Sequence, residues 1–197
     1  NAGIPALHIS ERPAEANSRH TGGHWETDNM EGRRSDHLCV SATVERKTRY
    51  TLLGILENKT AVEKTNSVIS GLSSFPKTLL KTLTSDNGKE NSYCQLTKSV
   101  LGTEVYKTTP YHSWEKGTVE NTIGRLRRFL PKGQTLIGLT PEYLQLIQDR
   151  MNNTPRKCLK FRTPQEVMDK EVRKLARLQL KQTDRNQTVE GGFATLN

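Results

Sequence analysis

The sequence contains few cysteines and no long apolar runs, and each shortage excludes a class of protein. Its three cysteines are odd in number, widely spaced and without a C-x-x-C pair, which argues against a disulfide scaffold and a structural zinc site. No segment approaches the roughly 20 apolar residues of a membrane span, and no apolar stretch follows a basic start as in a signal peptide. We therefore expect a chain of a reducing, cytoplasmic compartment.

Acidic residues are also in deficit. The 197 residues include 30 Lys and Arg against 21 Asp and Glu, which gives a net charge of +9 and a pI near 9.6. Such a balance suits a polyanionic partner such as nucleic acid, or an anionic membrane face. Only 32% of the residues are hydrophobic, which is enough for one modest core and not for two.

The first part of the chain predicts an arm followed by strands. Residues 1–22 are polar, carry two prolines and show no sustained period, so we expect an extended arm or linker there. Three strand-like segments joined by short polar turns then predict an antiparallel meander over residues 24–30, 38–45 and 50–56.

After the meander, short strands alternate with helices. The expected elements are a helix from the capping box Thr60–Glu63, a strand at 82–85, a helix at 91–101 and a strand at 104–108. The helix at 91–101 rests on the helical spacing of Tyr93, Leu96 and Val100. Because such alternation implies parallel pairing, we predict an α/β fold with a mixed sheet flanked by helices.

Beyond Pro110 the pattern is helical and then basic. Apolar residues at helical spacing form a stripe at Val119, Ile123, Leu126 and Leu130, and further helices are expected to start at Thr140 and Thr163, each followed by proline. The expected organisation is an arm at 1–22, a core at 23–170 and a basic, partly disordered tail at 171–197.

Three acidic residues stand where an open α/β sheet gathers its ligands. Asp28 lies in the first strand on the same face as Glu26, Asp86 follows the strand at 82–85, and Glu120 lies beside the apolar stripe. Each alone has an ordinary explanation: a solvated carboxylate, a turn, or a surface pair with Lys116. Together, in a basic protein, they favour a site for Mg²⁺ or Mn²⁺. Two such ions promote phosphodiester displacement.

Six motifs, in order along most of the chain, carry a family resemblance. They are ISERPAE at 9–15, GHWETD at 23–28, VERKTRYTLL at 44–53, KTLTSDNGKE at 81–90, KGTVENTIGRLRRFLPKG at 116–133 and NNTPRKCLKFRTPQEV at 152–167. The chain resembles the DDE-class transposases of bacterial insertion sequences, in the group typified by insertion sequence number thirty. The core of these proteins is ribonuclease H-like and similar to that of retroviral integrases. The 33 residues between Asp86 and Glu120 match the interval expected in such a triad.

The resemblance implies that Asp28, Asp86 and Glu120 form the catalytic, metal-binding triad and hold two Mg²⁺ or Mn²⁺ ions. It implies cleavage of double-stranded DNA at element ends by water, then attack of the freed 3′-hydroxyl on target DNA, without a covalent enzyme intermediate or a nucleotide cofactor. The expected setting is the bacterial cytoplasm at the nucleoid, as a homo-oligomer on DNA and with no membrane partner. The family's upstream helix-turn-helix region is expected to lie outside this sequence.

The sequence departs from the family pattern beside the first two carboxylates. Thr27 stands where the family usually has glycine, and Asn29 where an aliphatic residue follows the first aspartate. Ser85 and Asn91 replace aromatic or larger apolar residues around the second one. We expect Asn29 and Ser85 to cost about 1–3 kcal/mol each if their polar groups are buried without partners.

Basic residues gather around the third carboxylate and in the last motif, where they favour phosphate contacts. The predicted DNA-binding residues are Lys116, Arg125, Arg127, Arg128, Lys132, Arg156 and Lys157. The alternative for each is an ordinary solvated surface. Trp114 could either stack on a splayed base or pack within its loop.

Two other functions stay open at this point. A truncated, inactive remnant of a transposase would bind DNA without cutting it. A ribonuclease H-like nuclease would cleave RNA–DNA hybrids without strand transfer. The motif at 152–167 favours the transposase over a stand-alone nuclease.

Overall fold

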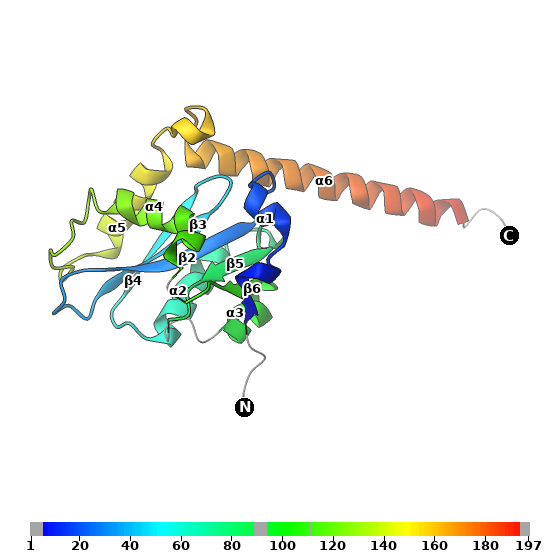
Figure 1. The fold of residues 1–197 in the computed structure, drawn as a ribbon. Helices are drawn as coiled ribbons and strands as arrows, with labels where there is room; N and C mark the ends of the chain where they lie inside the picture. Colours follow the sequence, from blue (N-terminus) through cyan, green and yellow to red (C-terminus); the bar gives the residue numbers. More distant parts are fainter. Residues whose placement is uncertain (1–5, 89–93, 111, 194–197) are drawn as a thin grey trace.

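A six-stranded mixed sheet forms the centre of the protein (Figure 1). The computed structural model describes residues 6–88, 94–110 and 112–193. The strands lie in the order β1-β6-β5-β2-β3-β4, with bounds β1 Leu7–His8, β2 His24–Glu31, β3 Cys39–Glu45, β4 Thr51–Leu56, β5 Thr82–Ser85 and β6 Glu104–Lys107. β2, β3 and β4 pair antiparallel, whereas β5 pairs parallel with both β2 and β6. The predicted α/β fold, a meander continued by parallel strands, is confirmed.

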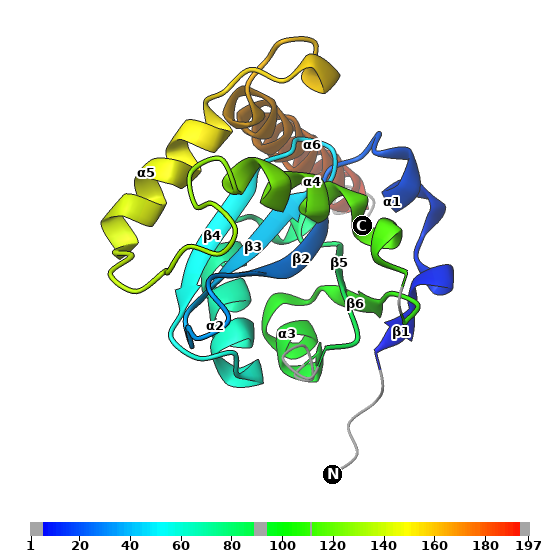
Figure 2. The ribbon, with the colours of Figure 1, turned by 60° about the vertical axis from the view of Figure 1, so that its left-hand side comes forward.

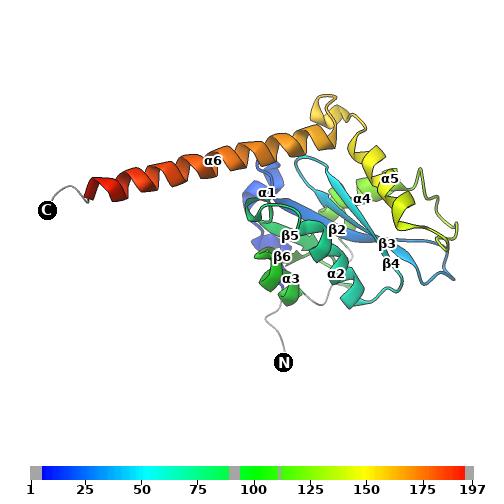
Figure 3. The ribbon, with the colours of Figure 1, turned by 180° about the vertical axis from the view of Figure 1, so that it is seen from behind.

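Helices cover both faces of this sheet. The α-helices are α1 Ala14–Ser18, α2 Ala61–Leu72, α3 Cys94–Leu101, α4 Gly117–Leu126, α5 Pro141–Asn152 and α6 Pro164–Phe193, and the short 3-10 helices are η1 Ile9–Glu11, η2 Lys77–Leu79, η4 Ser113–Lys116 and η5 Lys157–Leu159. Seen from behind, α2 and α3 lie over one face (Figure 3). α4 and α5 lie over the other face (Figure 2).

Two clusters of buried side chains match these two faces. Trp25 of β2 packs with Leu72 of α2 in one cluster, and Met30 of β2 packs with Leu126 of α4 in the other. Because side chains alternate across a strand, Asp28 shares the face of Met30. β2 therefore presents its carboxylate on the side of the sheet that α4 covers.

Three helices begin where capping signals predict them. The Thr60 hydroxyl accepts a hydrogen bond from the backbone N–H of Glu63 at the start of α2, and Thr140 caps α5 in the same way. At the start of α6, the Thr163 hydroxyl accepts from the N–H of Glu166, whose carboxylate accepts from the N–H of Thr163. Each cap satisfies donors that the first helical turn leaves free.

The amino-terminal segment differs from the extended arm or linker that we expected. Leu7–His8 forms β1, which pairs parallel with β6, and Ala14–Ser18 forms a short helix. Between them, the buried Arg12 side chain donates from Nη1 to the Thr84 hydroxyl of β5 at 3.0 Å. This segment therefore belongs to the sheet, because β1 forms its edge strand and Arg12 binds β5.

The face of α3 that packs on the protein is not the one that the apolar spacing predicts. Leu96 and Val100 are 44% and 49% exposed, and Tyr93 lies outside the described residues. The buried face consists of Cys94, Thr97 and Leu101. Because the buried face includes a threonine, it has no clear apolar period. The prediction from apolar spacing therefore placed the buried face on the wrong side of this helix.

Helix α6 is one continuous helix of 30 residues, and its second half projects beyond the rest of the protein (Figure 1). Val167 and Met168 near its start are buried against the core. The helix continues through residues 171–193, where we expected a partly disordered tail. This segment is rich in lysine, arginine, glutamine and leucine, which favour helix. Among the described residues, no helix combines the length and apolar character needed to cross a membrane.

Candidate active site

The two predicted catalytic aspartates lie close together at one edge of the sheet. Asp28 is in the second half of β2, and Asp86 follows β5 directly. Because β2 and β5 are parallel neighbours, their carboxyl ends meet at the same edge. The Oδ2 atoms of both aspartates accept hydrogen bonds from one ammonium group, that of Lys116, at 2.8 and 3.1 Å.

Glu120 of α4 reaches the same pocket. This pocket, the carboxylate pocket, has a volume of about 440 Å³, and its lining includes Asp28, Asp86 and Glu120 together with Lys116 and His112. Glu120 follows Lys116 by one helical turn, but Lys116 pairs with the two aspartates instead of with Glu120. The structure thus brings all three predicted carboxylates to one pocket, from β2, from the end of β5 and from α4.

The donor groups of the carboxylate pocket are the oxygen ligands that Mg²⁺ and Mn²⁺ prefer. In the described part of the chain, no three His, Cys, Asp or Glu side chains already lie close enough together to hold a metal ion. The positive charge between Asp28 and Asp86 comes instead from Lys116, whose side chain is only 4% exposed. Two carboxylates that share one buried cation are a donor set that fits a divalent ion.

Two buried lysines support this edge of the sheet. Lys64 of α2 donates to the backbone oxygen of Asp28 and to the hydroxyl of Ser41, both at 2.9 Å. Burial lowers the pKa of Lys64 to about 7. Burial also acts to lower the pKa of Lys116, but the charges and hydrogen bonds of Asp28 and Asp86 outweigh it and raise that pKa. Lys116 therefore carries its charge at neutral pH and holds the two aspartates together.

Glu26 is a buried residue beside the candidate site for which the sequence motifs predicted no role. Its side chain is buried, and its Oε2 atom accepts hydrogen bonds from the backbone N–H groups of Thr118 and Val119, both at 2.9 Å. Its Oε1 atom lies 3.2 Å from Nε of Arg46. A carboxylate at the first turn of a helix satisfies free N–H groups and complements the helix dipole. The one signal in the sequence is that period two places Glu26 on the strand face of Asp28.

Trp114 lies exposed beside the carboxylate pocket. Its side chain is 68% exposed. Its ring stacks on His112, which lines the pocket, with 4.4 Å between the ring centroids. Of the two alternatives for this residue, the contact with His112 shows packing within the loop, and the 68% exposure leaves the indole accessible to a base.

The predicted DNA-binding residues fall into two groups. Lys116 and Arg156 are 3% and 8% exposed and bind protein groups, Arg156 donating from Nη2 to the backbone oxygen of Met151 at 2.8 Å. Arg127 is partly exposed but also binds a protein group, since it donates from Nη2 to the backbone oxygen of Glu31 at 2.6 Å. The other residues of the set are exposed or partly exposed, and they are Arg125, Arg128, Lys132 and Lys157.

The departures from the family pattern leave two polar atoms without partners. Within the described residues, Oδ1 of Asn29 and Oγ of Ser85 are buried and form no hydrogen bond. Thr27 differs, because its hydroxyl donates to the backbone oxygen of Ala42 and shares a hydrogen bond with the Thr43 hydroxyl. The expected destabilisation therefore applies to Asn29 and Ser85 and not to Thr27.

The fold is that of the catalytic core of retroviral integrases, a ribonuclease H-like α/β core. The catalytic core domain of BIV integrase superposes with a TM-score of 0.58 at 19% identity, covering 78% of this chain and 99% of that one. The simian T-cell lymphotropic virus intasome, solved in complex with PP2A regulatory subunit B56 gamma, contains a chain that superposes with a TM-score of 0.59 at 16% identity. That match covers 83% of this chain and 58% of the other.

Sequence comparison identifies the family within this fold. Transposase InsI for insertion sequence element IS30A of Escherichia coli strain K12 is 37% identical over 165 residues, 83% of this chain and 42% of the relative. The transposase for IS1086 of Cupriavidus metallidurans is 36% identical over 83% of this chain and 47% of the relative. The transposase for IS4351 of Bacteroides fragilis is 34% identical over 84% and 52%.

The chain belongs to this family of insertion-sequence transposases, as its six motifs predict. It spans about half the length of the curated relatives that it matches. No family model matches the chain.

Proposed function

We propose that this chain is the catalytic core of a transposase that cuts DNA at the ends of its element and joins the freed 3′ ends to target DNA. One observation carries the proposal: Asp28, Asp86 and Glu120 line a single pocket although they come from three separate elements. The chain has a net charge of +9. A basic protein that binds a polyanion gains nothing from gathered carboxylates unless cations offset their charge.

In this proposal the three carboxylates hold the divalent metal, as two Mg²⁺ or Mn²⁺ ions. When bound, such ions activate the attacking oxygen and stabilise the leaving oxygen of a phosphodiester displacement. The protein supplies the positions of the ligands. Glu26 fixes the first turn of α4 against β2, so that Glu120 and Asp28 stay at the same pocket. Lys116 offsets the charge of Asp28 and Asp86.

Double-stranded DNA, at the element ends and in the target, is the proposed substrate. Arg128, Lys132 and Lys157 are exposed and suit contacts with backbone phosphates, which are not sequence-specific and weaken with salt. Trp114 beside the pocket suits stacking on a base that leaves the duplex.

Assembly and location follow from the same proposal. An element has two ends that must be processed together, so we expect the chain to act as a homo-oligomer on DNA. One structural neighbour with this fold comes from an intasome. The setting that fits a bacterial insertion sequence is the cytoplasm, at the nucleoid.

A nicking assay tests the proposed function. The substrate is a labelled duplex taken from the DNA that flanks the gene, incubated with the full chain and MgCl2 or MnCl2. We expect a nick and a strand-transfer product with the unaltered chain and neither product with Asp86→Asn. Asp149→Asn is the matched control, because Asp149 is exposed on α5 and does not line the carboxylate pocket.

Three outcomes would overturn or redirect the proposal. Nicking that persists in Asp86→Asn would remove the assigned role of the triad. DNA binding without any metal-stimulated product would favour the inactive remnant. Cleavage of an RNA–DNA hybrid without strand transfer would favour the ribonuclease H-like nuclease.

A further inference from the structure

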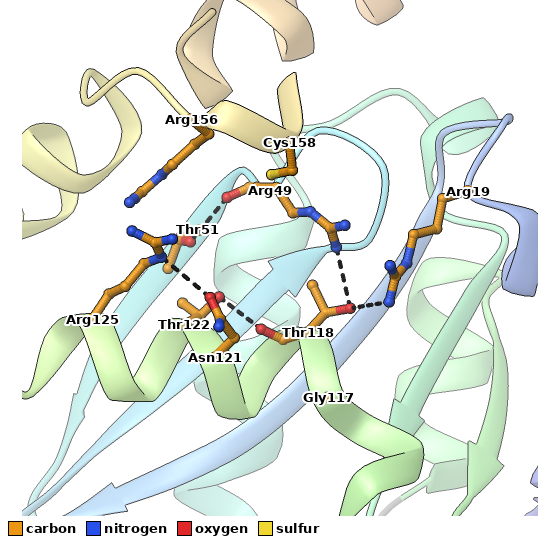
Figure 4. A pocket seen from close by; sticks show the side chains of 10 residues that line it. All are labelled: Arg19, Arg49, Thr51, Gly117, Thr118, Asn121, Thr122, Arg125, Arg156 and Cys158. Atoms are coloured by element: carbon orange, nitrogen blue, oxygen red, sulfur yellow. Dashed lines mark hydrogen bonds between the residues drawn. The ribbon is translucent and has the colours of Figure 1, made fainter. Parts of the chain in front are cut away.

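A second pocket, the arginine pocket, lies beside α4 (Figure 4). It has a volume of about 310 Å³, and four arginines line it: Arg19, Arg49, Arg125 and Arg156. The two pockets share no lining residue. On α4, Thr118 lines the arginine pocket, whereas Glu120 lies two residues later, about 200° further round the helix.

Four segments far apart in the sequence deliver these arginines. Arg19 follows α1, Arg49 lies in the turn between β3 and β4, Arg125 is on α4, and Arg156 precedes η5. Nη2 of Arg19 and Nη1 of Arg49 approach the same hydroxyl, that of Thr118, at 3.4 and 3.3 Å. The pocket has no acidic residue in its lining, and within the described part of the chain none of the four guanidinium groups forms an ion pair.

Two of these arginines occupy backbone conformations that favour glycine. The φ angles of Arg19 and Arg49 are +58° and +65°, in the left-handed region. Arg19 is also the C-cap of α1, close to the helix end where glycine is common. A side chain at such a position is unfavourable for the fold, and strain of this kind gathers at functional sites. Compared with glycine, arginine at these two positions supplies a guanidinium group, and both groups are directed at Thr118.

The arginine pocket concentrates positive charge without an internal counterion. Arg156 is 8% exposed. Burial, and next to it the charge of Arg125, lowers the pKa of Arg156. Like charges repel more strongly where water is excluded. An anion placed among the four groups would relieve this repulsion.

We propose that the arginine pocket binds a phosphate group of the DNA backbone, as a subsite separate from the carboxylate pocket. The identity of the ligand rests on the proposed function, because DNA is the polyanion that the carboxylate pocket would process. Planar guanidinium groups donate paired hydrogen bonds that match phosphate oxygens. Since Glu120 points to another side of α4, this phosphate belongs to DNA outside the bond that is cut.

The double variant Arg19→Gly and Arg49→Gly tests the proposal. It removes two guanidinium groups and relaxes both left-handed positions, so its thermal stability should be maintained or raised. We expect its affinity for a labelled duplex to fall about tenfold, and the slope of log affinity against log salt to decrease by about 1. Fluorescence anisotropy in EDTA measures both. The charge-matched control is Arg34→Gln with Lys77→Gln, two exposed positions outside both pockets, and it should bind nearly as the unaltered chain does.

The proposal would be overturned if DNA affinity fell equally in the test and control variants. It would also be overturned if the affinity and the salt slope of the test variant were unchanged. Arg49→Gln covers the case in which glycine loosens the turn, and it should weaken binding in the same direction. Because binding is measured without metal, it is independent of cleavage. If Asp86→Asn abolishes cutting while the glycine variant binds normally, the proposed function stands and the subsite fails.

Inorganic phosphate distinguishes the two sources of the anion. Its effect on the melting temperature is compared in the unaltered chain and the glycine variant. If phosphate stabilises only the unaltered chain while DNA affinity is the same in both, the pocket binds free phosphate and the DNA assignment is overturned. Loss of DNA affinity in the glycine variant supports the assignment.

Discussion

The buried carboxylate of Glu26 lies 2.9 Å from the backbone nitrogen of Val119 and so joins β2 to α4. It accepts a second hydrogen bond, of the same length, from the N–H of Thr118. Asp28 follows Glu26 by two residues on the same strand face. Glu120 directly follows Val119 on the helix. One buried residue therefore fixes the elements that carry two of the three candidate metal ligands, which makes Glu26 a positioning residue.

Glu26→Gln is expected to lower the free energy of unfolding by about 2–4 kcal/mol, because the amide weakens both hydrogen bonds to α4 and leaves the charge of Arg46 buried without its partner. Nicking should fall more than DNA binding does. Chemical denaturation measures the stability. The control is Glu31→Gln at the exposed end of β2, where the surface pair with Lys59 contributes less than about 1 kcal/mol. Equal effects of the two variants would contradict the positioning role.

Lys116→Gln is expected to destabilise the metal-free protein and to increase the stabilisation that Mg²⁺ provides. Without the ammonium, Asp28 and Asp86 repel each other until a divalent cation binds. The melting temperature in EDTA should fall, and saturating Mg²⁺ should add about 1–3 kcal/mol to stability, more than in the unaltered chain. Thermal denaturation with and without MgCl2 measures both, with Lys77→Gln as the surface control. A response to Mg²⁺ no larger than normal would show that Lys116 does not compete with a metal.

Ser85→Ala is expected to stabilise the protein by about 1 kcal/mol, or roughly 2–4 °C in melting temperature, because the buried Ser85 hydroxyl has no partner among the described residues. Thr27→Val, on neighbouring β2, is the contrasting variant. Its hydroxyl is hydrogen-bonded, so this change should destabilise. Differential scanning calorimetry measures both. Destabilisation by Ser85→Ala would mean that its hydroxyl is satisfied after all.

His24 should make stability depend on pH. Its side chain is buried and its Nδ1 atom shares a hydrogen bond with the Thr82 hydroxyl. Burial lowers its pKa from 6.5 to about 4, which outweighs the opposite effect of Glu15. Between these two pH values the unfolded chain binds a proton that the folded chain does not. Stability contributed by neutral His24 is therefore complete above about pH 6.5 and is lost as the pH falls towards 4.

The loss across this window should be about 2–3 kcal/mol. Urea denaturation at about pH 7 and about pH 4.5 measures it in the unaltered chain and in His24→Gln. The variant should be less stable at neutral pH and should show a smaller difference between the two conditions. The same pH difference in both proteins would rule out His24 as its source.

Local signals in the sequence account for much of the fold. Thr60, Thr140 and Thr163 begin helices because their side chains cap N–H groups only three residues away. Contacts between distant segments have no such signal. The bond from Arg12 to Thr84 joins residues 72 positions apart, so the amino-terminal segment could not be recognised as part of the sheet edge.

The candidate site shows the same division. The motifs and their spacing predict that Asp28, Asp86 and Glu120 belong to one site. The partners of Lys116 and Glu26 depend on where α4 lies against β2 and β5. The sequence placed Lys116 among the DNA-binding residues and offered Glu120 only as an ordinary surface partner for it. No single motif predicts the arginine pocket, because its four arginines come from four separate segments.

The most direct test of the metal site is the anomalous scattering of Mn²⁺ in crystals of the full chain. We predict Mn²⁺ peaks bound by the carboxylate oxygens of Asp28 and Asp86, with Glu120 completing the ligand set and the ammonium of Lys116 displaced. A crystal that contains Mn²⁺ only at other residues, with Lys116 still between the two aspartates, would contradict the proposed catalytic site.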